Sequence, residues 1–141
     1  MSLKIPVFAI LAAVCTLSVA GDAMAQGHCA TPRQYYSEWK KHPQQDYHYR
    51  NYYYKPTEKY SGYKHHYVVY SPKKPKHLYY YNPYKKQYWG RCHVEHAGRP
   101  LYSHLAPEHR GATLHDIPEA SFPEFGALPP IPESSDGHVL D

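Results

Sequence analysis

The sequence predicts a mainly β protein: a small antiparallel meander of four to five tyrosine-rich strands, one short N-terminal helix, and a long, proline-rich, irregular C-terminal tail. Three observations lead to this fold class. The chain has 141 residues and 17 tyrosines, 16 of which lie between residues 35 and 88. Tyrosine and valine runs there alternate with Pro, Gly and Asn, a pattern typical of strands and turns. Seven of the 14 prolines lie in residues 92–141, where they interrupt any long regular element.

Residues 1–25 are predicted to be an export signal that is removed from the mature chain. Lys4 supplies the positive charge, residues 5–19 are mostly apolar, and Ala23-Met24-Ala25 fits a cleavage site. A membrane anchor is the alternative, but the apolar stretch is shorter than the ~20 residues that a spanning helix needs. The sequence therefore predicts a secreted, periplasmic or cell-envelope protein with no transmembrane segment in the mature chain.

A short helix is predicted at residues 31–41, near the start of the mature chain. Thr31 can cap its N-terminus, Pro32 suits the first turn, and Pro43 stops it. Strands are then expected at five places, namely 47–54, 59–63, 66–70, 77–82 and 86–93.

A short motif predicts where three of these strands end. It consists of two aromatic or valine residues, a tyrosine, any residue and a proline. Its copies are Tyr52-Tyr-Tyr-Lys-Pro56, Val68-Val-Tyr-Ser-Pro72 and Tyr79-Tyr-Tyr-Asn-Pro83. Proline cannot continue a central strand, so each copy marks a turn. The first and third copies extend to Gly62 and Gly90, which suggests a duplicated hairpin about 27 residues apart.

Two cysteines stay in the mature chain, Cys29 and Cys92. In a small exported domain such a pair is most simply a disulfide. The bond would join the start of the mature chain to the end of its tyrosine-rich part. Two free thiols are the alternative.

The mature chain divides into a basic β domain, residues 26–93, and an acidic tail, residues 94–141. Residues 26–91 carry 13 Lys and Arg against 3 Asp and Glu, whereas residues 92–141 carry 2 against 8. The tail also holds 11 of the 14 Leu, Ile, Val and Phe residues of the mature chain. We therefore expect the tail to pack on the sheet, with buried tyrosine rings replacing aliphatic core. The alternatives are a disordered tail that docks elsewhere, or basic tyrosine-rich disorder throughout.

A resemblance covers about the last 65 residues. The segments that carry it are Tyr79-Tyr-Tyr-Asn-Pro-Tyr-Lys-Lys-Gln-Tyr-Trp-Gly-Arg91, Leu101-Tyr-Ser103, Asp116-Ile-Pro-Glu-Ala-Ser-Phe-Pro123 and Leu128-Pro-Pro-Ile-Pro-Glu-Ser-Ser-Asp-Gly137. In these segments the chain resembles a group of small exported proteins of unknown function from planctomycete bacteria. The resemblance implies that the tyrosine hairpin and the tail belong to one unit, and it implies no activity.

Catalytic and metal-binding motifs are weak in this sequence. There is no Gly-x-Ser-x-Gly elbow and no phosphate-binding glycine loop, so we expect a protein that is not an enzyme and needs no cofactor. Cys92-His-Val-Glu-His96 and His65-His66 contain side-chain types that bind zinc or copper. They lack a recognised ligand spacing, and we predict no metal site.

The predicted binding surface combines aromatic rings with lysines in the third motif copy and the strand after it. Its residues are Tyr79, Tyr81, Tyr84, Lys85, Lys86, Tyr88 and Trp89. Rings with hydroxyl groups beside cations suit an anionic glycan or an envelope protein, while export argues against nucleic acid. The sequence thus indicates a non-enzymatic exported binding protein. The alternatives are a structural or adhesive protein that self-associates through tyrosines, and a sheet with both faces covered, whose lysines only solvate the turns.

Overall fold

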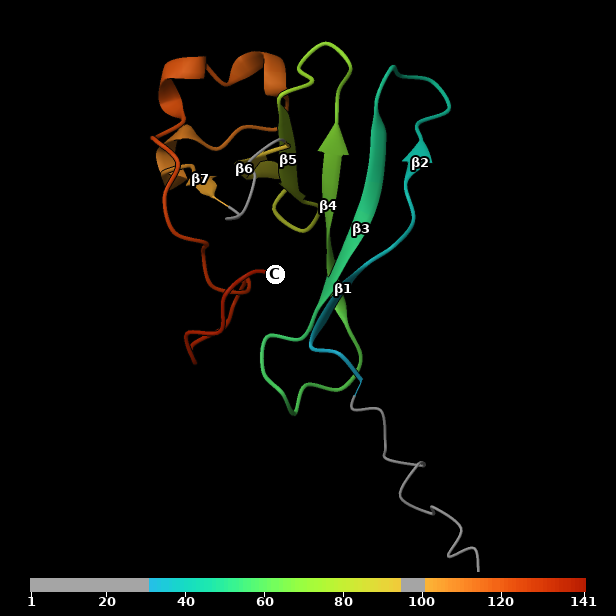
Figure 1. Ribbon diagram of the computed structural model, residues 1–141, viewed down its shortest axis with the longest axis vertical. Coiled ribbons are helices and arrows are strands. Elements are labelled where there is room, and N and C mark those ends of the chain that lie inside the picture. The colour runs from blue at the N-terminus through green and yellow to red at the C-terminus, as the bar shows by residue number, and fades with distance from the viewer. Residues whose placement is uncertain (1–30, 95–100) are drawn as a thin grey trace, which may run out of the picture. The chain divides into compact units, whose positions relative to one another are not determined.

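Tyrosine-rich and β-branched segments pair into one antiparallel sheet, so the mainly β fold class is confirmed. The structure is a computed structural model that describes residues 31–94 and 101–141. Within those residues seven strands form the sheet in the order β1-β3-β4-β5-β6-β7, and β2 also pairs with β3 (Figure 1). The strands are β1 (Gln34–Tyr36), β2 (Lys40–Lys41), β3 (His48–Tyr54), β4 (Lys64–Tyr70), β5 (His77–Asn82), β6 (Gln87–His93) and β7 (Tyr102–His104).

The helix predicted for residues 31–41 is wrong, because this segment forms β1 and β2 beside β3. Tyr35 pairs with Tyr53, and the centroids of their stacked rings are 4.8 Å apart. Lys40 pairs with Tyr49 further along β3. A helix of about ten residues is marginal by itself in water, whereas cross-strand aromatic pairs contribute roughly 0.2–1 kcal/mol each. Tertiary pairing therefore outweighs the local helix signals.

Four of the five predicted strands are confirmed, and their ends agree within two residues. The strand predicted at 59–63 is wrong, since it lies in the connection between β3 and β4, where Gly62 adopts a φ of 77°. The expected first hairpin is therefore replaced by a longer connection. The proline motif does mark strand ends: β3 ends at Tyr54, β4 at Tyr70 and β5 at Asn82, each one or two residues before its proline.

Alternate residues of the strands divide the tyrosines between the two faces of the sheet. One face, called the closed face, buries a cluster formed by Tyr52, Tyr54, Val68, Tyr80, Trp89, Tyr102, Ile131 and Leu140. The opposite face, called the open face, buries a smaller cluster formed by Val69, Tyr79, Leu105, Ile117 and Phe122. Tyrosines dominate the first cluster and also surround the second, where Tyr47, Tyr49, Tyr67 and Tyr88 pack against it.

Residues 101–141 supply aliphatic side chains to both faces. Leu105, Ile117 and Phe122 enter the open-face cluster, and Ile131 and Leu140 enter the closed-face cluster. After β7 this segment, drawn in orange to red in Figure 1, forms three single-turn 3-10 helices: η2 (Pro107–His109), η3 (Leu114–Asp116) and η4 (Glu119–Ser121). No helix among the described residues is long and apolar enough to cross a membrane.

Among the described residues, three ion pairs join basic residues before residue 92 to acidic residues of the C-terminal segment. They are Arg33 with Asp136, Lys64 with Glu133, and Arg91 with Glu119. The first and third have N···O distances of 2.7 and 2.6 Å. The opposite charges of the two parts of the sequence therefore meet across the surface of the sheet.

Candidate functional site

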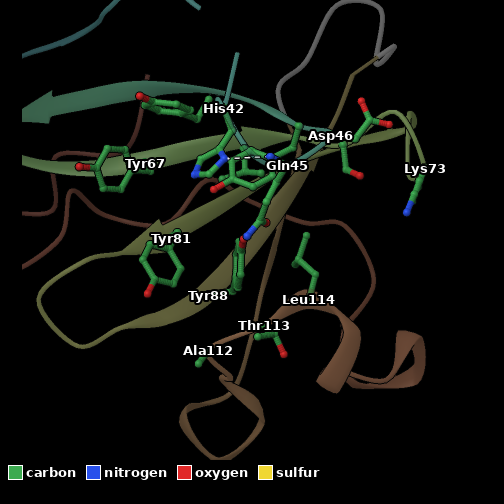
Figure 2. Close-up of a pocket in the computed structure, with 14 residues that line it drawn as sticks. His42, Gln45, Asp46, Tyr67, Lys73, Tyr81, Tyr88, Ala112, Thr113 and Leu114 are labelled. Carbon is green, nitrogen blue, oxygen red and sulfur yellow. Dashed lines mark hydrogen bonds between the residues drawn. The ribbon is translucent and has the colours of Figure 1, made fainter. Parts of the chain in front are cut away.

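A tyrosine-lined cleft of about 840 Å³ lies on the open face. Its walls are formed by His42, Gln45, Asp46, Tyr47, Tyr49, Tyr67, Val69, Ser71, Lys73, Tyr81, Tyr88, Ala112, Thr113 and Leu114. Figure 2 shows the loop residues His42 and Gln45 on one side and Ala112 and Thr113 on the other, with the rings of Tyr81 and Tyr88 between them and that of Tyr67 to the left. The volume is within the range of roughly 300–1,000 Å³ usual for small-molecule sites.

Strand register sets the row of rings at the floor of the cleft. Tyr67 of β4 pairs with Tyr81 of β5, and Tyr81 pairs with Tyr88 of β6, so all three side chains leave the same face. The rings of Tyr81 and Tyr88 meet edge to face, with centroids 4.9 Å apart. Tyr67 makes a similar contact with Tyr49 of β3 at 5.8 Å. The floor is therefore a rigid surface of tilted rings built on four strands.

Burial and neighbouring tyrosines shift the pKa values of two phenols in the cleft. Burial raises the pKa of Tyr47, and its neighbours Tyr49 and Tyr81 raise it further. Burial is also the main cause of the raised pKa of Tyr88, with smaller contributions from Tyr47 and Tyr81. Tyr47 and Tyr88 thus stay protonated, and each such phenol can donate one hydrogen bond and accept others. The cleft therefore presents several uncharged hydroxyl groups among apolar ring surfaces.

Backbone hydrogen bonds fix both walls of the cleft. In the loop before β3, the amides of Gln44 and Gln45 donate to Nδ1 of His42 over 3.2 and 3.1 Å. On the other side, the amide of Tyr88 donates to the carbonyl of Gly111 over 2.8 Å. This second bond holds residues 112–114 beside the floor. Asp46 and Lys73 add one negative and one positive charge to the walls.

The structure divides the seven predicted binding residues among four places. Tyr81 and Tyr88 line the cleft. Tyr79 belongs to the same face but is only 1% exposed, because Phe122 covers it at a ring-centroid distance of 5.9 Å. Tyr84, Lys85 and Lys86 are exposed in the turn between β5 and β6.

Trp89 lies on the closed face, where it is 5% exposed. A bulge between Tyr80 and Tyr81 shifts the register, so that Tyr80 pairs with Gly90 while Tyr81 pairs with Tyr88. Gly90 is required here because a Cβ atom would lie 2.2 Å from the hydroxyl of Tyr102. Trp89 directly follows Tyr88, and successive residues of a strand point to opposite sides, so the predicted surface is split between the two faces.

Three tyrosines of the cleft were not among the predicted residues: Tyr47, Tyr49 and Tyr67. The spacing of Tyr47 and Tyr49 is a strand signal that puts both rings on one face. The approach of Tyr67 to Tyr81 depends on the pairing of β4 with β5. The walls formed by residues 42–46 and 112–114 carry no sequence signal that we recognise.

The histidine pair and Cys92 do not form a metal centre in the described part of the chain. His65 and His66 are neighbours in β4 and therefore face opposite sides. Burial lowers the pKa of His66 to about 3, and its Nε2 lies 3.1 Å from the hydroxyl of Tyr54. Among residues 31–94 and 101–141, no group of three His, Cys, Asp or Glu side chains is placed to hold a metal ion.

Cys92 is half-buried, and burial raises the pKa of its thiol. Its predicted disulfide partner, Cys29, lies outside the described residues, as do the export signal and His96. The disulfide and the signal therefore stay predictions.

No protein family model, curated protein sequence or solved structure matches this chain. The resemblance to small exported planctomycete proteins thus stays a prediction.

Proposed function

We propose that this protein is a non-enzymatic, exported binding protein that holds a glycan in the tyrosine cleft. The observation that carries the proposal is the set of five tyrosines, Tyr47, Tyr49, Tyr67, Tyr81 and Tyr88, gathered around one cleft of about 840 Å³. Sugars combine apolar ring faces with many hydroxyl groups. Tyrosine offers the matching combination of a flat apolar ring and a hydroxyl that donates and accepts hydrogen bonds.

The rigidity of the floor favours binding. Its rings stand on paired strands and touch one another, so little side-chain entropy remains to be lost when a ligand is held. Lys73 in the wall, and the surplus of basic residues in this part of the chain, favour a glycan that carries carboxylate or sulfate groups. The expected ligand is therefore an anionic glycan.

Calorimetric titration with oligogalacturonates, and with neutral chito-oligosaccharides for comparison, tests the proposal. We expect Tyr81→Ala to weaken binding about tenfold, because loss of a ring contact costs on the order of 1.4 kcal/mol. Tyr81→Phe keeps the ring and should weaken binding less. Tyr60→Ala is the matched control, since Tyr60 is exposed in the β3–β4 connection and outside the cleft. If wild-type protein bound neither glycan at low salt, the proposal would be wrong.

A second candidate function, self-association through tyrosines, is favoured by aromatic side chains exposed outside the cleft. Tyr35 is 39%, Trp39 40% and Tyr84 58% exposed. Sedimentation at low and high salt distinguishes the two functions. Glycan binding through lysines weakens as salt increases, whereas association through rings does not.

A further inference from the structure

A row of partly exposed aromatic rings continues from the cleft along the open face. We call this row the ring ladder; it consists of Tyr67, His65, Tyr53, Tyr35 and Tyr63. Successive ring centroids are 5.3, 5.9, 4.8 and 4.9 Å apart. Tyr67 is also part of the cleft floor, so the two surfaces are continuous.

Strand pairing explains why these rings share one face. Tyr35 of β1 pairs with Tyr53 of β3, and Tyr53 pairs with His65 of β4. The three side chains therefore form one row across three strands. Tyr67 follows His65 by two residues, which returns it to the same side of β4. Tyr63 lies just before β4 and meets the edge of the Tyr35 ring.

The C-terminal segment covers another part of this face. Its buried residues Leu105, Ile117 and Phe122 pack against Val69 and Tyr79 of β4 and β5. Of the ladder rings, Tyr67 packs against the edge of this cluster, whereas Tyr35 is 39% exposed. A row of aromatic rings therefore extends from the cleft to the edge strand β1.

Lysines stand at both ends of this surface. At the β1 end, the ammonium group of Lys55 lies 4.9 Å from the centre of the Tyr63 ring. At the other end, Lys73 lines the cleft and Lys74 lies 5.9 Å from the centre of the Tyr79 ring. The acidic residue of the cleft wall is Asp46. The surface therefore has lysines at both ends and aromatic rings between them.

We propose that the open face binds a linear anionic polysaccharide whose chain leaves the cleft and runs along the ring ladder to β1. This inference rests on the proposed function and adds that the ligand is a polymer. A polymer repeats its sugar ring faces along one direction, as the ladder repeats its aromatic rings. Its negative groups are attracted by the lysines at both ends. Each further sugar that reaches the ladder adds contacts within the same complex, so affinity increases with chain length.

Size-defined oligogalacturonates, from dimer to decamer, test this inference by calorimetric titration. For wild-type protein we expect affinity to increase with length until the chain spans the ladder. Tyr35→Ala should weaken binding of the decamer about tenfold and leave dimer binding unchanged, because only a long chain reaches β1. Tyr67→Ala should weaken binding of both. Tyr35→Phe should retain most of the length dependence, since it keeps the ring, and Tyr60→Ala should behave like wild type.

Each outcome bears on one of the two proposals. If affinity were independent of length while dimer binding still required Tyr67, the polymer inference would fail and the proposed function would stand. If neutral chito-oligosaccharides bound as tightly, with no effect of salt, the anionic character would be wrong. If no glycan of any length bound, both proposals would fail. A dimer of the protein that Tyr35→Ala dissociates would assign the ladder to self-association and overturn the inference.

Discussion

The two faces of the sheet are both rich in tyrosine, but the C-terminal segment covers them to different extents. On the closed face, Tyr52 and Tyr54 are 0% exposed and pack with Ile131 and Leu140 of the C-terminal segment. On the open face, Leu105, Ile117 and Phe122 cover only part of the surface, and the rest forms the cleft. The role of a tyrosine here is therefore decided by whether the C-terminal segment reaches it.

The tyrosine hydroxyl groups also have different hydrogen-bonding surroundings on the two faces. The hydroxyl of Tyr52 donates to Oε1 of Gln34, and that of Tyr54 meets Nε2 of His66 at 3.1 Å. Burial raises the pKa of both phenols well above its usual range. These two hydroxyls of the closed face thus serve internal hydrogen bonds that burial makes necessary. Those of the cleft are placed where a ligand can reach them.

The largest expected effect is a difference in unfolding free energy between variants of a core tyrosine and of a cleft tyrosine. We expect Tyr52→Ala to lower the free energy of unfolding by about 3–5 kcal/mol, because it leaves a cavity in a packed cluster. Tyr49→Ala on the open face should cost only about 1 kcal/mol, since its half-buried ring borders the cleft. Denaturation in urea measures both. Equal losses for the two variants would mean that the faces do not differ in packing.

A smaller loss of stability is expected on acidification, because His66 is buried on the closed face. Its pKa is lowered to about 3, mainly by burial, whereas histidine in an unfolded chain titrates near 6.5. Between these values only the unfolded chain takes up the proton, so stability falls as the pH drops below about 6.5. We expect a loss of roughly 2–3 kcal/mol between pH 7 and pH 4, given ~1.4 kcal/mol per pKa unit.

His66→Gln is the variant that checks the source of this acid sensitivity. Glutamine can still hydrogen-bond the hydroxyl of Tyr54 but does not titrate. The variant should therefore show a flatter dependence of unfolding free energy on pH, even if it is less stable at pH 7. An unchanged slope would assign the sensitivity to other groups, such as His77 on the open face, whose pKa is lowered to about 4.

The smallest effect compares the ion pairs that hold the C-terminal segment. Arg91 is 7% exposed at its side chain and also stacks on Phe122, at 4.1 Å from the ring centre. Glu119→Gln should cost about 1 kcal/mol, because it removes the charged partner of a buried guanidinium. Glu133→Gln, which breaks the more exposed pair with Lys64, should cost about 0.5 kcal/mol or less. Urea denaturation of both variants at low salt measures the difference.

Strand positions could be predicted from the sequence because the signals are local. The prolines at 56, 72 and 83 end three strands, and runs of tyrosine favour extended backbone wherever they occur. The helix signals of the segment 31–41 mislead because they are local, whereas the strand that pairs with this segment, β3, follows later in the chain. β7 is a three-residue strand and carries no comparable pattern.

The candidate site was predictable only in part. Tyr81 and Tyr88 were expected to bind because rings and lysines are adjacent in their hairpin. Tyr79 is buried and not part of the cleft surface, because Phe122, 43 positions later, covers it. Trp89 lies on the other face because it directly follows Tyr88 in β6, and successive residues of a strand point to opposite sides. The burial of Tyr79 depends on a contact between distant segments, which no spacing rule contains, whereas the side of Trp89 follows from strand alternation.

The hydrogen bond between the amide of Tyr88 and the carbonyl of Gly111 has a consequence for how such a site can be changed. It ties one wall of the cleft to the floor through main-chain atoms, whereas the side chain of Leu114 in the same wall also packs against the open-face cluster. The position of Ala112 can therefore be exchanged to widen, narrow or recharge the entrance while Leu114 is kept for its packing. The sheet that carries the rings and this position at the edge of the cleft can thus be changed independently.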